Sequence, residues 1–205
     1  MFDLERNLYD QGHRYIACID EVGRGCLFGD VVACAIILPV RYTIEGVKDS
    51  KKLSPSKRDK LYDYILRDAI AVGIGRVEPE IIDNINIKEA TRLAMKLALQ
   101  SMQDKLGNRI TPTKILIDAE KIETDIPQLG IIDGDNLVHG ISAASIVAKV
   151  FRDRLCIKWD MDYPGYDLAN NKGYGTSKHI NALIEKGPVQ LHRKSFISRI
   201  MEGKR

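Results

Sequence analysis

The sequence lacks the cysteine pattern of a zinc ribbon or of a disulfide framework. Its four cysteines, Cys18, Cys26, Cys34 and Cys156, include no C-x-x-C pair. Three of them stand in an apolar stretch, where a small buried thiol is the usual interpretation. We therefore expect free thiols and a reducing compartment, which favours the cytoplasm.

Long hydrophobic runs are also missing. The longest apolar stretch, Val31 to Val40, has the length of a strand and falls far short of the roughly 20 residues that cross a bilayer. The N-terminal segment MFDLERNLYDQ is charged and has no apolar core, which excludes a secretory signal peptide. We therefore expect a soluble, cytoplasmic protein with no membrane partner.

Net charge is small, but charge of one sign gathers locally. The 205 residues carry 31 Lys and Arg against 28 Asp and Glu, a formal net charge of +3. Segment 118–136 holds six acids and one lysine, hence −5, whereas 46–60 and 172–205 carry +4 and +6. The near-neutral total does not exclude a nucleic-acid partner, because clustered charge decides that. Each basic run is either a solvated face or a grip on phosphates, and Lys51 is a candidate substrate-binding residue.

The apolar fraction of 44% fits one globular domain over residues 1–205. Patterning predicts strands at 14–20, 29–39, 71–77 and 114–118, and helices at 55–70, 86–106, 142–160 and 177–186. Ser54 and Pro55 open the first of these helices, and Gly107 is the expected end of the second. The tight link between the first two strands predicts an antiparallel pair. The order of elements predicts an α/β fold with a mixed sheet and a helical C-terminal part from about 141 to 205.

Carboxylates stand where predicted strands end. Asp20 and Glu21 end the first strand, Asp118 ends the strand 114–118, and Asp135 follows in a loop before a helix. Each alone could cap a helix or pair with a lysine, but together with the other acids of 118–136 they would repel one another without a cation. Oxygen ligands without histidine or cysteine favour Mg²⁺ or Mn²⁺, and no H-E-x-x-H motif supports a zinc hydrolase. Two such ions could clamp a phosphoryl group.

A glycine-rich turn follows the first acid pair. Gly23 and Gly25 let backbone N–H groups approach a ligand closely, and Arg24 offers a planar donor fork for phosphate. The same turn could be a tight loop with an exposed arginine. Tyr174 stands between glycines in KGYGT, where it could stack on a sugar or base, or pack on the surface.

Eight segments follow one another along nearly the whole chain. They are IDEVGRG (19–25), DSKKLS (49–54), INIKEATRLAM (85–95), ILIDA (115–119), GD (134–135) with ISAASIVAKVFRD (141–153), YPGY (163–166), KGYGT (172–176) and HRKSF (192–196). In this order they resemble the ribonuclease HII family, the type 2 ribonucleases H. The resemblance implies a ribonuclease H-like fold, with a mixed central sheet flanked by helices and a helical C-terminal extension.

The resemblance also implies an activity and the residues that carry it. The activity is hydrolysis of the RNA strand of RNA/DNA hybrids and incision 5′ of single ribonucleotides in duplex DNA, by two-metal-ion chemistry leaving 5′-phosphate and 3′-hydroxyl ends. The acids that match the family's metal-binding and catalytic residues are Asp20, Glu21, Asp118 and Asp135. The motif that senses the ribose 2′-hydroxyl matches Gly23, Arg24 and Gly25. Tyr174 matches the tyrosine that stacks on the sugar after the ribonucleotide.

Several positions depart from the residues common in that family. They are Cys26, Phe28, Asp30, Asp133 and Asn171, where the family commonly has proline, alanine, proline, lysine and histidine. Aspartate for lysine at Asp133 changes the local charge by −2 beside the proposed metal site. We keep Asp135 as the loop ligand because it preserves the family's Gly-Asp order. Our hypothesis is that Asp133 shifts the optimum metal concentration or favours Mn²⁺.

Three alternatives stay open at this point. Another metal-dependent nuclease or strand-transfer enzyme of the same fold should lack the GRG and KGYGT pair. Ribonuclease HIII carries an added N-terminal domain, and only 13 residues precede the first predicted strand. A catalytically silent hybrid-binding protein would not need the full set of acids. We expect a monomer, and the C-terminal ISRIMEGKR contains no clear sliding-clamp motif.

Overall fold

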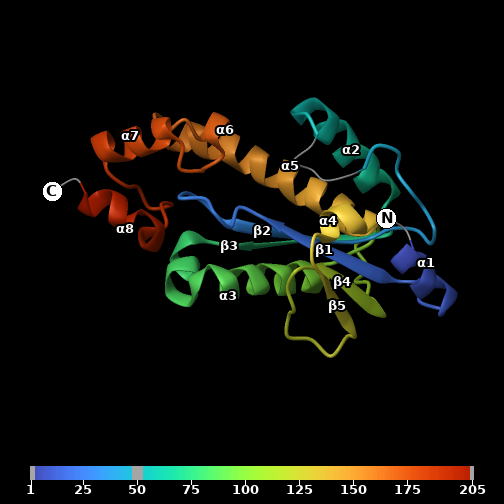
Figure 1. Ribbon diagram of the computed structural model, residues 1–205. Helices are drawn as coiled ribbons and strands as arrows, with labels where there is room; N and C mark the ends of the chain where they lie inside the picture. Colours follow the sequence, from blue (N-terminus) through green and yellow to red (C-terminus); the bar gives the residue numbers. More distant parts are fainter. Residues whose placement is uncertain (1–2, 48–52, 204–205) are drawn as a thin grey trace.

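A five-stranded mixed sheet forms the middle layer of the computed structural model, which describes residues 3–47 and 53–203 (Figure 1). The strands are β1 (Ile16–Val22), β2 (Val31–Ile37), β3 (Ala71–Val77), β4 (Lys114–Asp118) and β5 (Gln128–Ile131). Their order across the sheet is β3-β2-β1-β4-β5. β2 is antiparallel to both β1 and β3, whereas β4 is parallel to β1 and β5 is parallel to β4. The predicted mixed sheet and its antiparallel first pair are therefore confirmed.

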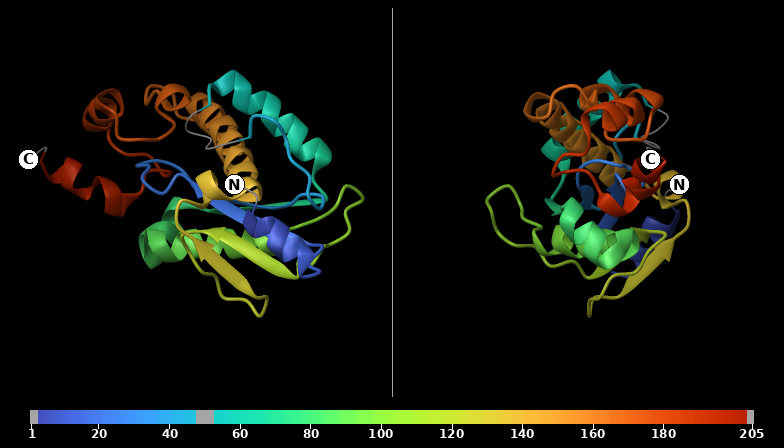
Figure 2. Two further views of the ribbon diagram at one scale, coloured as in Figure 1. Left: turned by 45° about the vertical axis from the view of Figure 1, so that its right-hand side comes forward. Right: turned by 90° about the vertical axis from the view of Figure 1, so that its left-hand side faces the viewer.

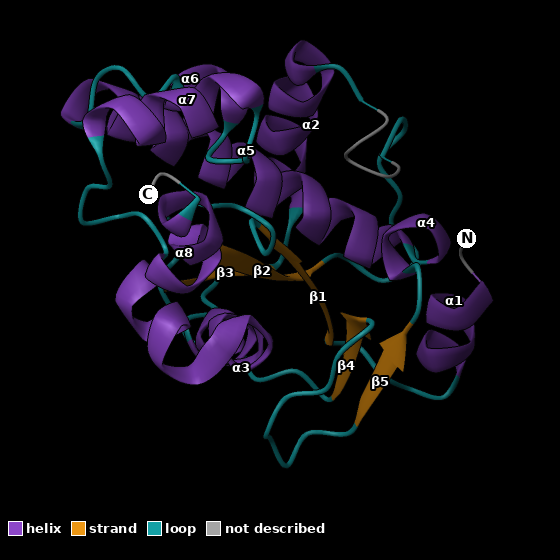
Figure 3. Cartoon of the chain, turned by 60° about the vertical axis from the view of Figure 1, so that its left-hand side comes forward, coloured by secondary structure: helices purple, strands orange, loops and turns teal. Residues whose placement is uncertain are grey.

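Helices cover both faces of this sheet. They are α1 (Asp3–Asp10), α2 (Pro55–Asp68), α3 (Pro79–Gln100), α4 (Gly134–Leu137), α5 (His139–Asp162), α6 (Leu168–Asn171), α7 (Ser177–Lys186) and α8 (Lys194–Glu202). α3 packs on one face and α5 on the other (Figures 1 and 2). α6, α7 and α8 gather away from β4 and β5, as the predicted helical C-terminal part (Figure 3). Over residues 3–47 and 53–203, no helix has both the length and the apolarity to cross a membrane.

Alternation along β1 determines which side chains face which helix. Ala17 and Ile19 belong to the core beneath α3, whereas Cys18 belongs to the core beneath α5. Successive side chains of a strand point to opposite faces, so Asp20 continues the α5-facing row that contains Cys18. β2 is buried along its whole length, which agrees with its prediction as a central strand. All four cysteines are free, as expected, and all four are buried, where burial was expected for three.

Local signals explain the start of α2. Ser54 Oγ accepts a hydrogen bond from the Lys57 N–H, and Pro55 occupies the first turn. This is the capping arrangement predicted from the sequence. The helix ends at Asp68, close to the expected end, because β3 begins three residues later at Ala71.

The prediction for α3 was wrong at both ends. The helix begins at Pro79 and is interrupted at Asn86, whose φ of 67° is non-helical and whose Oδ1 accepts the N–H groups of two following residues. The predicted start therefore coincides with a restart inside a longer helix. The helix ends at Gln100 because the chain then pairs Gln103 with Val72 of β3. Gly107 lies in the loop beyond and does not cap the helix.

Helix α1 was not predicted, yet it fixes the start of α5. The buried Glu5 carboxylate accepts the N–H groups of His139 and Gly140, at 3.1 and 3.3 Å. These N–H groups have no partner within their own helix, so the carboxylate satisfies them and meets the positive end of the helix dipole. α5 is thereby anchored where it crosses β1.

Close packing of α3 on β3 yields a stability prediction. A Cβ added at Gly75 would lie 1.9 Å from the Ala94 carbonyl oxygen, so the two backbones would have to separate. We expect Gly75→Ala to lower the free energy of unfolding by about 2–3 kcal/mol, measured by urea denaturation. Gly203→Ala is the control, because its new Cβ would meet nothing closer than 3.5 Å. Equal stability of the two variants would contradict this packing.

Candidate active site

Parallel pairing of β1 with β4 brings two acids together. The register sets Cys18 opposite Leu116, and both side chains belong to the core beneath α5. Two residues further along each strand, Asp20 and Asp118 therefore stand side by side on the α5 face. The sheet thus places both carboxylates at the carboxyl ends of two adjacent parallel strands, a common position for functional sites.

Asp20, Glu21 and Asp118 form a compact cluster. One oxygen from each carboxylate lies within 4.8 Å of the other two. Asp20 is only 4% exposed, and its Oδ1 accepts the Glu21 N–H at 2.8 Å. Asp118 Oδ1 accepts the Gly134 N–H at 2.8 Å, which ties β4 to the start of α4, the short helix that carries Asp135 where the sequence predicted a loop. Backbone groups therefore fix the orientation of two of the three carboxylates.

Burial and the repulsion of neighbouring acids raise the pKa values of Asp20 and Glu21. The pKa of Asp20 lies well above its usual value, chiefly because burial penalises the charged form, and then because of Glu21 and Asp118. Burial also raises the pKa of Glu21, although the Arg24 guanidinium opposes that change. Holding these acids together therefore lowers the stability of the fold, and an added cation would offset that loss.

The cluster fits a divalent metal ion. Glu21 Oε2 is buried and has no hydrogen-bond partner within the part of the chain that the structure describes. A buried carboxylate oxygen without a donor is costly, and a cation is the partner that such an oxygen lacks. All three side chains offer oxygen, the donor atom that Mg²⁺ and Mn²⁺ prefer.

A single pocket joins this cluster to two other predicted residues, Asp135 and Tyr174, and to residues that were not predicted. Its walls include Asp135, Ser145, Lys149 and Tyr174 in addition to the three acids. Asp135 is buried but lies outside the group of three, and its backbone carbonyl accepts a hydrogen bond from the Ser142 hydroxyl. Tyr174 is 41% exposed at the same pocket, so the structure brings the KGYGT loop to the acids.

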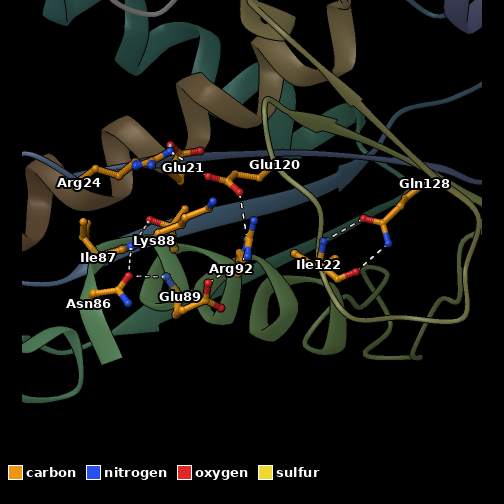
Figure 4. Close-up of polar contacts among 11 residues, drawn as sticks. Glu21, Arg24, Asn86, Ile87, Lys88, Glu89, Arg92, Glu120, Ile122 and Gln128 are labelled. Atoms are coloured by element: carbon orange, nitrogen blue, oxygen red, sulfur yellow. Dashed lines mark hydrogen bonds and ion pairs between the residues drawn. The ribbon is translucent and has the colours of Figure 1, made fainter. Parts of the chain in front are cut away.

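Arg24 links the cluster to α3 through a chain of charges. Its Nη1 lies 3.2 Å from Glu21 Oε1 and 3.5 Å from Glu120 Oε1 (Figure 4). Glu120 in turn pairs with Arg92 at 3.1 Å, and Arg92 pairs with Glu89 on the same helix. Arg24 therefore balances acid charge in this structure. The acidic segment 118–136 is partly neutralised by α3.

The basic runs behave differently from each other. Lys51 lies outside the described residues, together with part of the run 46–60. Within 172–205, Lys194 and Arg199 are exposed, but Arg193 is fully buried. Arg193 therefore does not belong to the exposed phosphate-gripping surface expected from its run of charge. Its guanidinium instead binds backbone carbonyl groups of the Gly23–Gly29 segment.

Sequence reasoning missed a polar row on α5. Ser142, Ser145, Lys149 and Arg152 follow one another at spacings of three, four and three residues, which places them on one face of the helix. Ser145 and Lys149 line the pocket, and the Ser145 hydroxyl hydrogen-bonds Asp20. The spacing within an otherwise apolar helix was the signal that could have found them.

Two departures from the family pattern complete a local core. Phe28 is fully buried and packs edge-on against His192, with ring centroids 4.8 Å apart, and against Trp159 at 5.9 Å. The Asp30 carboxylate is also buried and pairs with Arg76 at 2.7 Å. A larger apolar ring and a compensated charge are thus both accommodated beside the glycine-rich turn.

Two other departures hold the KGYGT loop. The Cys26 thiol donates to the Lys172 carbonyl at 3.5 Å. The Asn171 amide donates to the Tyr166 carbonyl at 2.7 Å and accepts the Gly173 N–H at 2.8 Å. The asparagine therefore satisfies buried backbone groups on both sides of the loop start.

Comparison with known proteins identifies the family. The family model for ribonuclease HII matches residues 17–199. Ribonuclease HII of Alkaliphilus oremlandii is 56% identical over 97% of this chain and 98% of the relative. The chain belongs to the ribonuclease HII family. A second family member, ribonuclease HII of Alkaliphilus metalliredigens, is 54% identical over 98% of each chain.

Solved structures agree with this assignment. The chain is similar to ribonuclease H2 of Pyrococcus horikoshii, with a TM-score of 0.75, 25% identity, and coverage of 92% of this chain and 98% of that one. The ribonuclease HII of Archaeoglobus fulgidus, solved as a PCNA complex, has a TM-score of 0.72 and 22% identity over 93% and 96%. Bst-RNase HIII, solved with Mn²⁺, has a TM-score of 0.68 and 16% identity over 98% and 71%. The ribonuclease H-like fold expected of a ribonuclease HII is thus confirmed.

The acid cluster yields a pH prediction. Because the pKa of Asp20 is raised in the folded protein, folding favours the protonated carboxyl group. The stability gained in this way is fully present below the usual pKa of 3.8 and is lost as the pH rises through the raised pKa. In chelator, Asp20→Asn should therefore match the wild type at low pH and melt a few degrees higher at pH 8. Scanning calorimetry between pH 4 and 8 measures this.

The exposed acid Asp63 on α2 provides the control, as Asp63→Asn. Added Mn²⁺ should then raise the melting temperature of the wild type more than that of Asp20→Asn. A melting difference that does not depend on pH would contradict the account of mutual repulsion.

Asp133 yields a prediction about metal demand. It is exposed, with a left-handed φ of 55° that asparagine also tolerates, so Asp133→Asn removes only charge. We expect the half-saturating Mg²⁺ or Mn²⁺ concentration for cleavage to rise about twofold to fivefold, as for a screened surface charge. Asp125→Asn is the control, because Asp125 precedes β5 at the end of that strand remote from Asp118. Identical metal curves for both variants would remove Asp133 from the account.

Proposed function

We propose that the protein is an endoribonuclease that hydrolyses the RNA strand of RNA/DNA hybrids and incises 5′ of single ribonucleotides embedded in duplex DNA. The observation that carries the proposal is the single pocket in which the acid cluster meets Tyr174. The acids supply hydrolytic chemistry, and the tyrosine supplies a ring at the edge of that chemistry. This proposal deepens the family assignment to a substrate and a cut site.

Recognition of RNA requires contact with the 2′-hydroxyl, the group that distinguishes it from DNA. Gly23, Arg24 and Gly25 follow the acid pair within the same turn and offer backbone N–H groups at short range. Tyr174 stands near Gly25, since a Cβ there would lie 4.0 Å from its ring. We therefore assign the turn to the 2′-hydroxyl and Tyr174 to stacking on the sugar that follows. A site built to hydrogen-bond a hydroxyl rejects the substrate that lacks it.

Asp20, Glu21 and Asp118, with Asp135 on the pocket wall, would hold Mg²⁺ or Mn²⁺. When bound, two such ions would supply activation of water and neutralisation of the charge on the scissile phosphate, and the proposed cut leaves 5′-phosphate and 3′-hydroxyl ends. Lys149 lies on the same wall, where its ammonium group can offset charge on a phosphate oxygen. Asp153 holds that ammonium at 2.7 Å, so its position is set in advance.

The remaining assignments rest on the sequence and extend the same proposal. We take residues 1–205 as one catalytic domain and Lys51 as a substrate-binding residue. The monomeric state, the cytoplasmic location and independence of a sliding clamp also stay predictions. The PCNA complex of the Archaeoglobus fulgidus relative makes the clamp question worth a direct binding assay.

The test is cleavage of a labelled DNA duplex containing one ribonucleotide, beside an RNA/DNA hybrid and an all-DNA duplex. We expect incision 5′ of the ribonucleotide that requires Mg²⁺ or Mn²⁺. Asp118→Asn should reduce cleavage at least about 10³-fold and retain the wild-type circular dichroism spectrum, since it removes a carboxylate from the reacting centre. Asp125→Asn should cleave normally.

Two results would count against this function. Tight binding of the substrates without any cut would indicate a hybrid-binding protein. Wild-type turnover by Asp118→Asn would remove that residue from the site.

A further inference from the structure

Arg193 is a fully buried arginine directly beneath the glycine-rich turn. Its Nη1 donates to the Arg24 carbonyl at 2.8 Å, and its Nη2 donates to the Gly23 carbonyl at 2.8 Å. Both Nε and Nη2 donate to the Gly29 carbonyl, at 2.9 and 2.7 Å. One planar guanidinium therefore binds three carbonyl groups from the two ends of a short loop, a geometry that a lysine ammonium cannot reproduce.

These bonds set the direction of two N–H groups. A trans peptide points its C=O and its N–H to opposite sides, and no peptide of the described residues is cis. Because the Gly23 carbonyl points toward Arg193, the Arg24 N–H points away from it. The Arg24 carbonyl also points toward Arg193, so the Gly25 N–H in the same peptide points away from it. Gly25 is exposed, so the side opposite the buried guanidinium is the substrate side of the turn.

A second buried arginine supports the neighbouring loop. Arg152 donates to the Lys172 carbonyl at 2.7 Å and to the Phe28 carbonyl at 3.0 Å, and so joins the KGYGT loop to the glycine-rich turn. A Cβ at Gly23 would lie 2.3 Å from Arg152 Nε, and Gly23 has a left-handed φ of 92°. Gly23 thus rests directly on Arg152, while its own carbonyl is bound by Arg193.

We propose that Arg193 is a positioning residue that determines the preference for a ribonucleotide, by aiming the Arg24 and Gly25 N–H groups at the 2′-hydroxyl. This rests on the proposed function, in which that turn senses the hydroxyl. Arg193 itself touches no substrate, because it is fully buried. Its loss should therefore reduce discrimination between ribose and deoxyribose without weakening attraction to the phosphate backbone.

The test compares binding of two duplexes that differ by one 2′-hydroxyl. Asp118→Asn serves as the uncleaving background, and fluorescence anisotropy gives the Kd for a duplex with one ribonucleotide and for the all-DNA duplex. The background protein should prefer the ribonucleotide. Arg193→Lys in that background keeps the charge but loses the fork, and should reduce the preference to within about twofold of unity, with the all-DNA Kd changed less than about twofold. Arg199→Lys, on the exposed face of α8, should leave both values unchanged.

The outcomes separate the two proposals. If the background protein shows no preference, recognition of the hydroxyl by this turn fails, and the proposal for Arg193 fails with it. If it shows a preference that Arg193→Lys keeps, or if both affinities fall together, only the proposal for Arg193 is overturned.

If Arg193→Lys does not fold, the amide resonances of the uncleaving background protein provide the readout. The Arg24 and Gly25 N–H signals should shift more with the ribonucleotide duplex than with all-DNA, and equal shifts would overturn recognition of the hydroxyl by this turn together with the proposal for Arg193.

Discussion

Repulsion among one buried carboxylate, Asp20, and two half-buried ones, Glu21 and Asp118, is the constraint on which the candidate site depends. Asp20 and Asp118 are neighbours because β1 and β4 are parallel and their register sets matching positions side by side. Glu21 joins them within 4.8 Å, and burial raises the pKa values of Asp20 and Glu21. Arg24 offsets only part of this charge, so the arrangement lowers the stability of the fold and favours the binding of a divalent cation.

Arginines supply the positive charge that the protein itself provides. Arg24 and Arg92 lie on the acidic side, where they pair with Glu21 and Glu120 (Figure 4). Arg152 and Arg193 bind carbonyl groups instead of carboxylates, Arg193 at Gly23 and Arg24 of the turn and Arg152 at Phe28 and Lys172 beside it. The turn between them is therefore held by charge-assisted hydrogen bonds from beneath, which leaves its remaining N–H groups for a substrate.

Much of this site could be predicted from the sequence, because acids at the ends of apolar strands and glycines beside them are local signals. The strand that ends on Asp118 is an example, since its apolar run and its final acid are adjacent. The resemblance to ribonuclease HII placed Tyr174 in one site with the acids, although Tyr174 follows Asp118 by more than fifty residues in the sequence. No local sequence pattern could have shown that Tyr174 and the acids line one pocket, because the packing of the helices between them in the sequence brings them together.

The errors have physical causes as well. Arg193 stands in a basic run of the sequence. Only the tertiary structure shows that its side chain is buried and that its guanidinium binds backbone carbonyl groups. Asn86 caps the point at which α3 resumes after its interruption, and in the sequence this looks like the start of a helix. The helical segment that begins at Pro79 was therefore missed. Lys149 is a single lysine in the apolar first part of α5, and only the tertiary structure shows that it lines one pocket with Asp20.

The central claim is that Asp20, Glu21 and Asp118 together form a divalent-cation site. Anomalous diffraction from crystals soaked in Mn²⁺ tests it most directly, because the signal locates the ion without reference to activity. We predict a Mn²⁺ peak within coordination distance of oxygens from all three carboxylates, and no such peak in crystals of Asp20→Asn. A peak elsewhere, or none at a Mn²⁺ concentration that supports cleavage, would contradict it.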